Sequence, residues 1–177
     1  MAPRSDLGRF AAQFLFMNKY LSFAFALIFS AIIYSQNITA KVVGVKDGDT
    51  VVILFENKQI VVRLEHIDTP EKRQPYGLKA KMFASDFCFG KSVKVIGNGK
   101  KDRNGRWIAE IYVNNQNLGK ELVRNGLAWH YKKYSKSSNY AALEIGARKK
   151  RVGLWQDSLA VAPWNFRKKK KVPTKTL

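Results

Sequence analysis

The sequence is poor in the residues that build disulfides and zinc sites. It has one cysteine, Cys88, so no disulfide can form within the chain, and only two histidines, His66 and His130. Zinc is held mainly by clusters of Cys and His, and the sequence has no such cluster. Cys88 falls within an apolar helical pattern, so we expect a buried structural thiol rather than a nucleophile.

Acidic residues are also scarce. The 177 residues include 13 Asp and Glu against 32 Lys and Arg, and the formal net charge is +19. A field of this sign attracts polyanions, either nucleic acid or an anionic membrane surface. The alternative is a basic protein whose charged surface is simply solvated.

The sequence also lacks an apolar run long enough for a typical membrane-spanning helix. The uncharged apolar run at residues 21–34 is shorter than the roughly 20 residues that a membrane-spanning helix needs. With Lys19 before it, this run suits the hydrophobic region of a signal peptide, and Met17 is an alternative start of the chain. We therefore expect residues 1–35 to be a signal peptide, cleaved near Ser35, of a secreted or cell-envelope protein, periplasmic or extracellular. An uncleaved N-terminal membrane anchor is the alternative.

The few acids gather around one expected hairpin. Two strand-like apolar runs, residues 51–55 and 60–64, are joined by a polar link at residues 56–59 that is short enough for a hairpin. A hairpin returns the chain on itself, so Asp49 and Asp68 are expected to lie close together. Carboxylates brought together repel each other and need a cation. Oxygen ligands without Cys or His favour Ca²⁺ or Mg²⁺.

The rest of the chain predicts a small β-rich domain. Further strands are expected at residues 40–45, 92–96 and 106–113, and helices at residues 77–89, 120–125 and 139–151. Five short strands with helices inserted late indicate a closed five-stranded barrel of the OB-fold type, in an α+β, mainly β class with about three helices. We expect one domain over residues 36–160 and an irregular basic C-terminal tail over residues 161–177.

Five short motifs, taken in order and spacing, resemble the staphylococcal nuclease (thermonuclease) family. They are Asp47-Gly48-Asp49-Thr50, Arg63-Leu64, Asp68-Thr69-Pro70-Glu71, Asn104-Gly105-Arg106 and Leu122-Val123-Arg124-Asn125-Gly126-Leu127-Ala128. The resemblance covers roughly residues 38–156. It implies an OB barrel with three helices, in agreement with the pattern of strands and helices.

The resemblance also implies a chemistry, the Ca²⁺-dependent hydrolysis of phosphodiester bonds in DNA and RNA with 3′-phosphate products. By position, Asp49 and Asp68 would hold Ca²⁺ with their carboxylates and Thr69 with its backbone carbonyl. Glu71 would act on the attacking water, as general base or as its orienting acceptor. Arg63 and Arg106 would hold the scissile phosphate, which a guanidinium matches with its planar fork and a lysine does not.

Three further residues are candidates for substrate binding. Arg103 lies in the loop before Arg106, and the aromatic and basic segment after Trp129 contains Tyr131 and Tyr134. These tyrosines either stack on nucleic-acid bases, as in single-strand binders, or cover the barrel. We expect His66 and His130 to be structural, because the family pattern has no catalytic histidine there.

One geometric condition must be met for this site. Side chains alternate along a strand, so Arg63 and Asp68 fall on opposite faces unless the chain bends or bulges before Asp68. Beyond the domain, Trp164 and Phe166 are expected to dock the tail. The charged run at residues 167–171 either touches the backbone of long substrates outside the active site or is solvated.

Three classes of function remain open from the sequence. The favoured one is an exported nuclease that acts on DNA and RNA, works as a monomer and needs no protein partner. A non-catalytic nucleic-acid-binding module on the same barrel is the alternative, but such a module should lose acids or arginines that this chain keeps. A membrane-anchored protein that binds anionic lipid is the third class, and it gives no reason for Asp49, Asp68 and Glu71.

Overall fold

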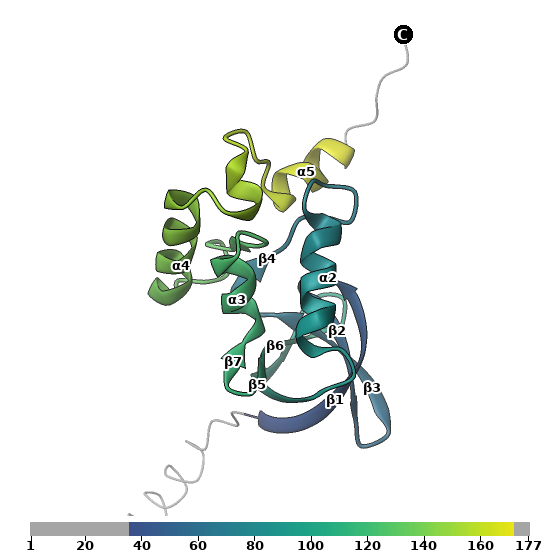
Figure 1. Cartoon of the computed structure of the whole chain (residues 1–177). Coiled ribbons are helices and arrows are strands. Elements are labelled where there is room, and N and C mark those ends of the chain that lie inside the picture. The colour runs from purple at the N-terminus through teal and green to yellow at the C-terminus, as the bar shows by residue number, and fades with distance from the viewer. Residues whose placement is uncertain (1–35, 172–177) are drawn as a thin grey trace, which may run out of the picture. The chain divides into compact units, whose positions relative to one another are not determined.

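A computed structural model describes residues 36–171, which form a five-stranded barrel with helices around it (Figure 1). The barrel strands are β1 (Gln36–Asp47), β2 (Thr50–Phe55), β3 (Lys58–Leu64), β5 (Ser92–Lys101) and β6 (Trp107–Val113). They follow the order β3-β2-β1-β5-β6, and a parallel pairing of β3 with β6 closes the barrel. The expected OB-type barrel in a mainly β, α+β fold is thus confirmed.

Tight two-residue turns join β2 to β3 and β6 to the strand that follows it. Glu56 and Asn57 have φ values of 48° and 59°, and the link between β2 and β3 is these two residues rather than the four expected. Two consecutive residues with positive φ are typical of a type I′ turn, whose twist matches that of a hairpin. Asn114 and Asn115, with φ of 48° and 64°, make the same kind of turn between β6 and β7 (Gln116–Asn117).

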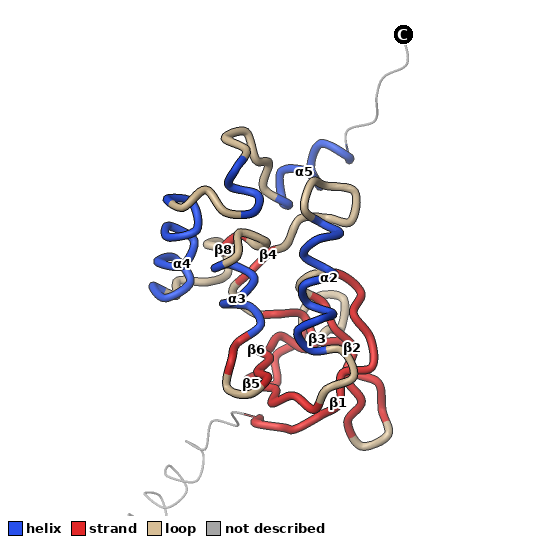
Figure 2. The backbone as a smooth tube through the Cα atoms, viewed as in Figure 1, coloured by secondary structure: helices blue, strands red, loops and turns tan. Residues whose placement is uncertain are grey.

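The chain leaves the barrel at a sharp bend just before Asp68. His66 has a φ of 72°, in the left-handed region that a non-glycine residue rarely adopts. The next two residues form β4 (Ile67–Asp68), which pairs with β8 (Trp129–His130) in a separate two-stranded sheet (Figure 2). The bend that the sequence required between Arg63 and Asp68 is therefore present.

Three main helices lie where the sequence predicts them, and a further helix forms where none was expected. The main ones are α2 (Gly77–Cys88), α3 (Leu118–Arg124) and α4 (Ser138–Lys149). A 3₁₀ helix, η1 (Gly153–Gln156), and a fifth helix, α5 (Pro163–Lys171), follow. The segment after Trp155 was expected to be irregular, and this is wrong for α5. Pro163 stands at its first position, where a proline costs no intrahelical hydrogen bond.

Helix α2 turns a face of small residues to the barrel. Its buried residues are Gly77, Ala80, Ala84 and Cys88, whereas the large apolar Leu78 and Met82 are exposed. The helix approaches very closely, because a Cβ on Gly48 would lie only 2.8 Å from the Cβ of Ala80. Large side chains do not fit in that space, so the helix–barrel contact selects small residues. This contact fixes the turn that carries Asp49.

Residues 1–35, where we expect the signal peptide, lie outside the residues that the structure describes. Within residues 36–171, no helix combines the length and the apolar character that crossing a membrane requires.

Candidate active site

All nine predicted site residues line one cleft of about 840 Å³ at the end of the barrel. They are Asp49, Arg63, Asp68, Thr69, Glu71, Arg103, Arg106, Tyr131 and Tyr134. They come from the β1–β2 turn, from β3, from β4 and the segment after it, from the loop before β6 and from the segment after β8. Closure of the barrel and the bend at His66 bring these segments together.

Asp49 is held in a defined orientation at the start of β2. It is only 3 % exposed, and its Oδ2 accepts the backbone N–H of Thr69 at 2.7 Å. Its Oδ1 accepts the hydroxyl of Thr50 at 3.1 Å, and its own N–H donates to Asp47 Oδ1 at 3.3 Å. These bonds fix the Asp49 carboxylate beside Thr69, and they account for the turn formed by Asp47 and Gly48.

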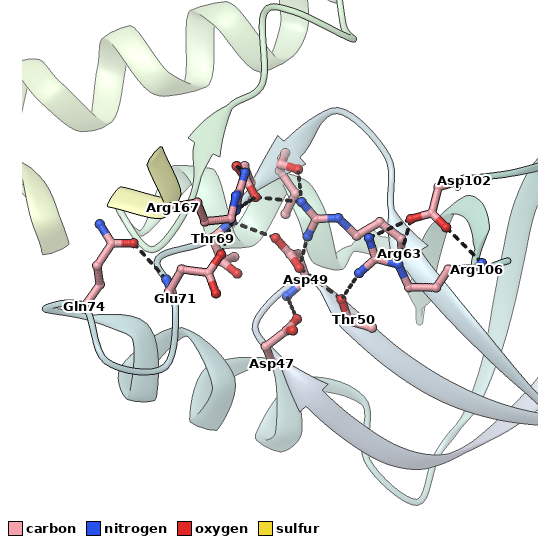
Figure 3. A network of polar contacts seen from close by, with 12 residues as sticks. Asp47, Asp49, Thr50, Arg63, Thr69, Glu71, Gln74, Asp102, Arg106 and Arg167 are labelled. Carbon is pink, nitrogen blue, oxygen red and sulfur yellow. Dashed lines mark hydrogen bonds and ion pairs between the residues drawn. The ribbon is translucent and has the colours of Figure 1, made fainter. Parts of the chain in front are cut away.

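Arg63 joins the two buried aspartates. Its Nη1 forms an ion pair with Asp49 Oδ1 (Figure 3). Its Nη2 donates to Asp68 Oδ1 at 2.7 Å. Asp68 is 1 % exposed. The two carboxylates, far apart in the sequence, thus contact a single guanidinium, which confirms that the hairpin brings them together. A buried carboxylate needs such compensation, since burying a charge without a partner is very costly.

Arg106 lies on the other side of the same network. Its Nε donates to Asp102 Oδ2 at 2.7 Å, and its Nη1 reaches the Thr50 hydroxyl at 3.4 Å. Burial alone would raise the pKa of Asp102, but hydrogen bonds from the Arg106 guanidinium and from the N–H groups of Arg106 and Asn104 outweigh it and lower that pKa. Asp102 therefore stays ionised and keeps Arg106 pointing into the cleft.

Glu71 follows the bend on a tightly packed loop. Its backbone N–H donates to Gln74 Oε1 at 2.9 Å, and Gln74 Nε2 in turn donates to the carbonyl of Val161 at 2.8 Å. A Cβ on Gly77 would lie 2.0 Å from the Glu71 carbonyl oxygen, so only glycine fits there. The Glu71 side chain is 40 % exposed and faces the cleft.

Arg167 of α5 is a site residue that the sequence analysis placed elsewhere. Its Nη2 donates to Asp68 Oδ2 and its Nη1 to Glu71 Oε1, both at 2.7 Å. Burial alone would lower the pKa of Arg167, but its bonds to Asp68 and Glu71 raise the pKa above the usual value, so the group stays charged. Residues 167–171 were expected either to touch long substrates outside the active site or to be solvated, and neither alternative placed Arg167 in the cleft, where it lies. Pro163 was the one signal in the sequence for a helix there.

The candidate substrate-binding residues lie at the rim of the cleft. The Tyr131 ring is stacked on Trp164 of α5, with centroids 5.2 Å apart and planes 2° from parallel. Tyr134 packs edge-on against Tyr131 and is 66 % exposed. Arg103 lies in the exposed loop before β6. The Lys133 ammonium lies over the exposed Tyr134 ring, 5.4 Å from its centroid, whereas Tyr131 is engaged in the docking of α5.

The two histidines take part in a structural hydrogen-bond arrangement beside the site. His66 Nδ1 and His130 Nε2 each lie 2.9 Å from the hydroxyl oxygen of Ser135. Burial lowers the pKa of His130, and the nearby Lys132 and His66 lower it further, against the opposing effect of Glu144. His130 is thus held neutral, as suits a residue that ties β8 to the following loop.

Every donor in the predicted metal set is an oxygen, the type of ligand that divalent cations such as Ca²⁺ and Mg²⁺ take. In the part of the chain that the structure describes, no group of three or more His, Cys, Asp and Glu side chains is placed to hold a metal ion. The predicted set has only two carboxylates, and its third donor is the backbone carbonyl of Thr69. Both carboxylates are buried and each contacts a guanidinium, so positive charge already stands beside the oxygens that a cation would use.

Comparisons with known proteins identify the family of this chain. Residues 61–157 match the family described as "Staphylococcal nuclease homologue". An uncharacterized endonuclease of Haemophilus influenzae is 41% identical, over 76% of this chain and 75% of that protein. An uncharacterized endonuclease of Escherichia coli O157:H7 is 35% identical over 87% of this chain and 100% of its own length. A micrococcal nuclease of Shigella flexneri is 34% identical over 76% of this chain and 83% of its own. The chain belongs to the staphylococcal nuclease family.

Proposed function

We propose that this protein is an exported, Ca²⁺-dependent nuclease that hydrolyses phosphodiester bonds of DNA and RNA and leaves 3′-phosphate products. Membership of the staphylococcal nuclease family supports the hydrolysis of nucleic acids. The observation that carries the finer proposal is the convergence of Asp49, Asp68, Glu71, Arg63 and Arg106 in one cleft. The net charge of +19 suits a polyanionic substrate.

The two arginines suit the binding of a phosphate. A phosphodiester carries a negative charge, and more charge develops on its oxygens as the attacking oxygen approaches. Preorganised cations stabilise this charge best when they do not have to move during the reaction. Arg106 is fixed by Asp102 and Thr50, and Arg63 by Asp49 and Asp68, so both forks are positioned before the substrate arrives.

Glu71 is the group that suits proton transfer. Its carboxylate is half-exposed in the cleft, and its backbone is held by Gln74. In the proposed step Glu71 takes a proton from water as the water oxygen bonds to phosphorus. The bond between phosphorus and the 5′ oxygen breaks, and its electron pair leaves with that oxygen. The phosphate then remains on the 3′ side.

Asp49, Asp68 and the backbone carbonyl of Thr69 would hold the cation, which when bound supplies Lewis-acid charge to the phosphate. Ca²⁺ is proposed over Mg²⁺ because a site built partly from backbone has irregular geometry, and Mg²⁺ demands a near-ideal octahedron. In the protein itself, the bonds from Thr69 and Thr50 to Asp49 hold that carboxylate in place.

One digestion experiment tests the proposal. Purified residues 36–177 are incubated with single- and double-stranded DNA and with RNA, in Ca²⁺, in Mg²⁺ and in chelator. We expect cleavage in Ca²⁺ only, products that a 3′-phosphatase converts to 3′-hydroxyls, and cleavage by the Glu71→Gln variant that is about 10²–10⁴-fold slower. Full activity in Mg²⁺ alone would refute the assignment of the metal. DNA binding without cleavage in any condition would favour the non-catalytic module.

Export is proposed from the sequence of residues 1–35 and has its own test. Mass spectrometry of material from the native cells should find a mature protein that starts near Gln36 in the secreted or envelope fraction. Peptides from residues 21–34 in the mature protein would indicate an uncleaved anchor instead.

A further inference from the structure

Arg167 contacts the same oxygens that the proposed cation needs. Its Nη2 lies 2.7 Å from Asp68 Oδ2, and its Nη1 lies 3.3 Å from Asp68 Oδ1. Arg63 takes Asp68 Oδ1 at 2.7 Å as well, so both oxygens of this carboxylate accept bonds from guanidinium groups. The same Arg167 Nη1 also lies 2.7 Å from Glu71 Oε1, an oxygen of the proposed proton acceptor.

The helix that carries Arg167 is docked rather than loosely attached. Trp164, one turn earlier, stacks on Tyr131 and packs edge-on against Trp129 with centroids 5.6 Å apart. Ala162 and Pro163 are buried, and the Val161 carbonyl accepts a hydrogen bond from Gln74 on the Glu71 loop. Figure 3 shows the Arg167 guanidinium reaching from α5 toward Glu71. The contacts of α5 with the segment around β8 and with the Glu71 loop therefore hold Arg167 in position.

We propose that Arg167 is a further residue of the active site, an internal cation that competes with the divalent metal for Asp68 and so sets the metal affinity. The inference rests on the proposed Ca²⁺ dependence. A carboxylate oxygen that accepts a short bond from a guanidinium loses much of its attraction for a second cation, which the first also repels. Ca²⁺ therefore has to displace Arg167 from Asp68, and the same displacement frees Glu71 to accept a proton.

Of the two guanidiniums on Asp68, Arg167 is the one positioned to give way. Arg63 lies on β3 inside the barrel sheet and bridges both buried aspartates, with a side chain 15% exposed. Arg167 lies in the middle of α5, and its side chain is 40% exposed. An exposed guanidinium that leaves Asp68 regains water, so its release costs less than that of Arg63.

Calcium affinity measured without substrate tests the proposal. Isothermal titration of the full protein with Ca²⁺ is compared for the wild type, Arg167→Gln and Lys168→Gln. The control removes the same charge from the next residue, which is exposed and takes part in none of the ion pairs found within residues 36–171. We expect Arg167→Gln to bind Ca²⁺ roughly tenfold more tightly, whereas Lys168→Gln changes little, as distance and solvent weaken its effect.

The outcomes separate this inference from the function it rests on. Ca²⁺ binding of equal affinity in all three proteins would overturn the role of Arg167 and leave the proposed calcium site standing. An equal gain in both variants would also overturn it, because only net charge would then matter. Absence of Ca²⁺ binding in every protein would overturn both the inference and the proposed metal.

A second measurement does not depend on a variant. Hydrogen exchange of the α5 backbone amides in the wild type is compared in chelator and in saturating Ca²⁺. If the metal displaces Arg167, α5 loses one of its attachments and its amides lose protection. Unchanged protection of α5 in Ca²⁺ would mean that Arg167 stays bound while the metal is present, which contradicts the proposed competition.

Discussion

At the scale of single residues, Glu71 tests the proposed chemistry most directly. Glu71→Gln keeps the size of the side chain but removes the proton acceptor, so kcat should fall by about 10²–10⁴-fold. The dissociation constant for DNA should change little, because the arginines proposed to bind phosphate remain. Glu65→Gln is the matched control, since Glu65 lines the same cleft and has no proposed role. An equal fall in both variants would point to a general effect of charge.

The two arginines proposed to bind phosphate should differ in how their replacement by lysine affects stability. Arg63→Lys and Arg106→Lys should each lower kcat by about 10²-fold, because the charge survives but the planar fork does not. Arg63→Lys should also lower the free energy of unfolding, since Arg63 compensates two buried carboxylates and Arg106 does not. Kinetics and urea unfolding give both quantities. Arg124→Lys on the exposed face of α3 is the control.

If Arg106→Lys keeps a kcat close to that of the wild type, Arg106 is only the surface partner of Asp102 and leaves the proposed active site.

The buried His130 predicts how stability depends on pH. Burial lowers its pKa below the ordinary value of 6.5, with Lys132 and His66 adding to the effect and Glu144 opposing it. As pH falls below about 6.5, the unfolded chain takes up this proton before the folded one does, so the folded state loses stability down to the folded pKa. Urea unfolding between pH 7.5 and pH 5 should show this loss. It should be smaller in His130→Gln, and an equal loss in the two proteins would refute the assignment to His130.

At the scale of elements, α2 illustrates what the sequence could and could not predict. Its position and length followed from apolar residues at helical spacing and from the glycine that ends it. Leu78 and Met82 fit the same helical spacing, yet both prove to be exposed. Periodicity counts apolar residues but says nothing of how closely a helix approaches its neighbour. The close contact of Ala80 with Gly48 depends on that distance.

The start of α2 gives a prediction for the loop that carries Glu71. A Cβ on Gly77 would lie 2.0 Å from the Glu71 carbonyl oxygen, which is backbone and cannot yield without moving the loop. Gly77→Ala should therefore destabilise the fold by about 1–3 kcal/mol and lower kcat as Glu71 shifts. Thermal unfolding and kinetics of the folded variant measure the two effects.

Gly146→Ala in α4 is the matched control, because a Cβ there meets nothing within 4 Å. It should stabilise the protein by roughly 0.5–1 kcal/mol, as expected for removing a glycine from a helix interior, and leave kcat unchanged. A Gly77→Ala variant that behaves like Gly146→Ala would show that the Glu71 loop is not held in this way.

At the scale of the whole molecule, local chemistry made the barrel and most of the site predictable. The hairpin that brings Asp49 to Asp68 and the need for a bend before Asp68 follow from strand alternation and turn residues. The contact of Arg167 with Asp68 and Glu71 does not, because it depends on how α5 packs on Trp129 and Tyr131. A run of basic residues in a sequence resembles a solvated tail until the partner of each charge is known.

Arg167 and the four lysines that follow it are expected to have different roles, and this leads to a final prediction on substrate binding. Lys168–Lys171 are four consecutive positive charges, and a polyanion that extends beyond the cleft would meet them as a sequence-independent contact. Each phosphate neutralised adds roughly 0.9 to the slope of log K against log salt on duplex DNA. Replacing the four lysines by Gln should therefore flatten this slope by up to several units on long DNA and leave kcat unchanged.

The same replacement should hardly affect a short oligonucleotide that fills only the cleft, because Arg63 and Arg106, the residues proposed to hold its phosphates, line the cleft and are unchanged. Arg167→Gln serves as the comparison, since it removes a charge that is directed at Asp68 and Glu71 rather than at solvent. It should change the salt slope less than the lysine replacement does. Binding to long DNA with an unaltered slope after the lysine replacement would mean that these charges are solvated, and that the field of the barrel alone attracts the substrate.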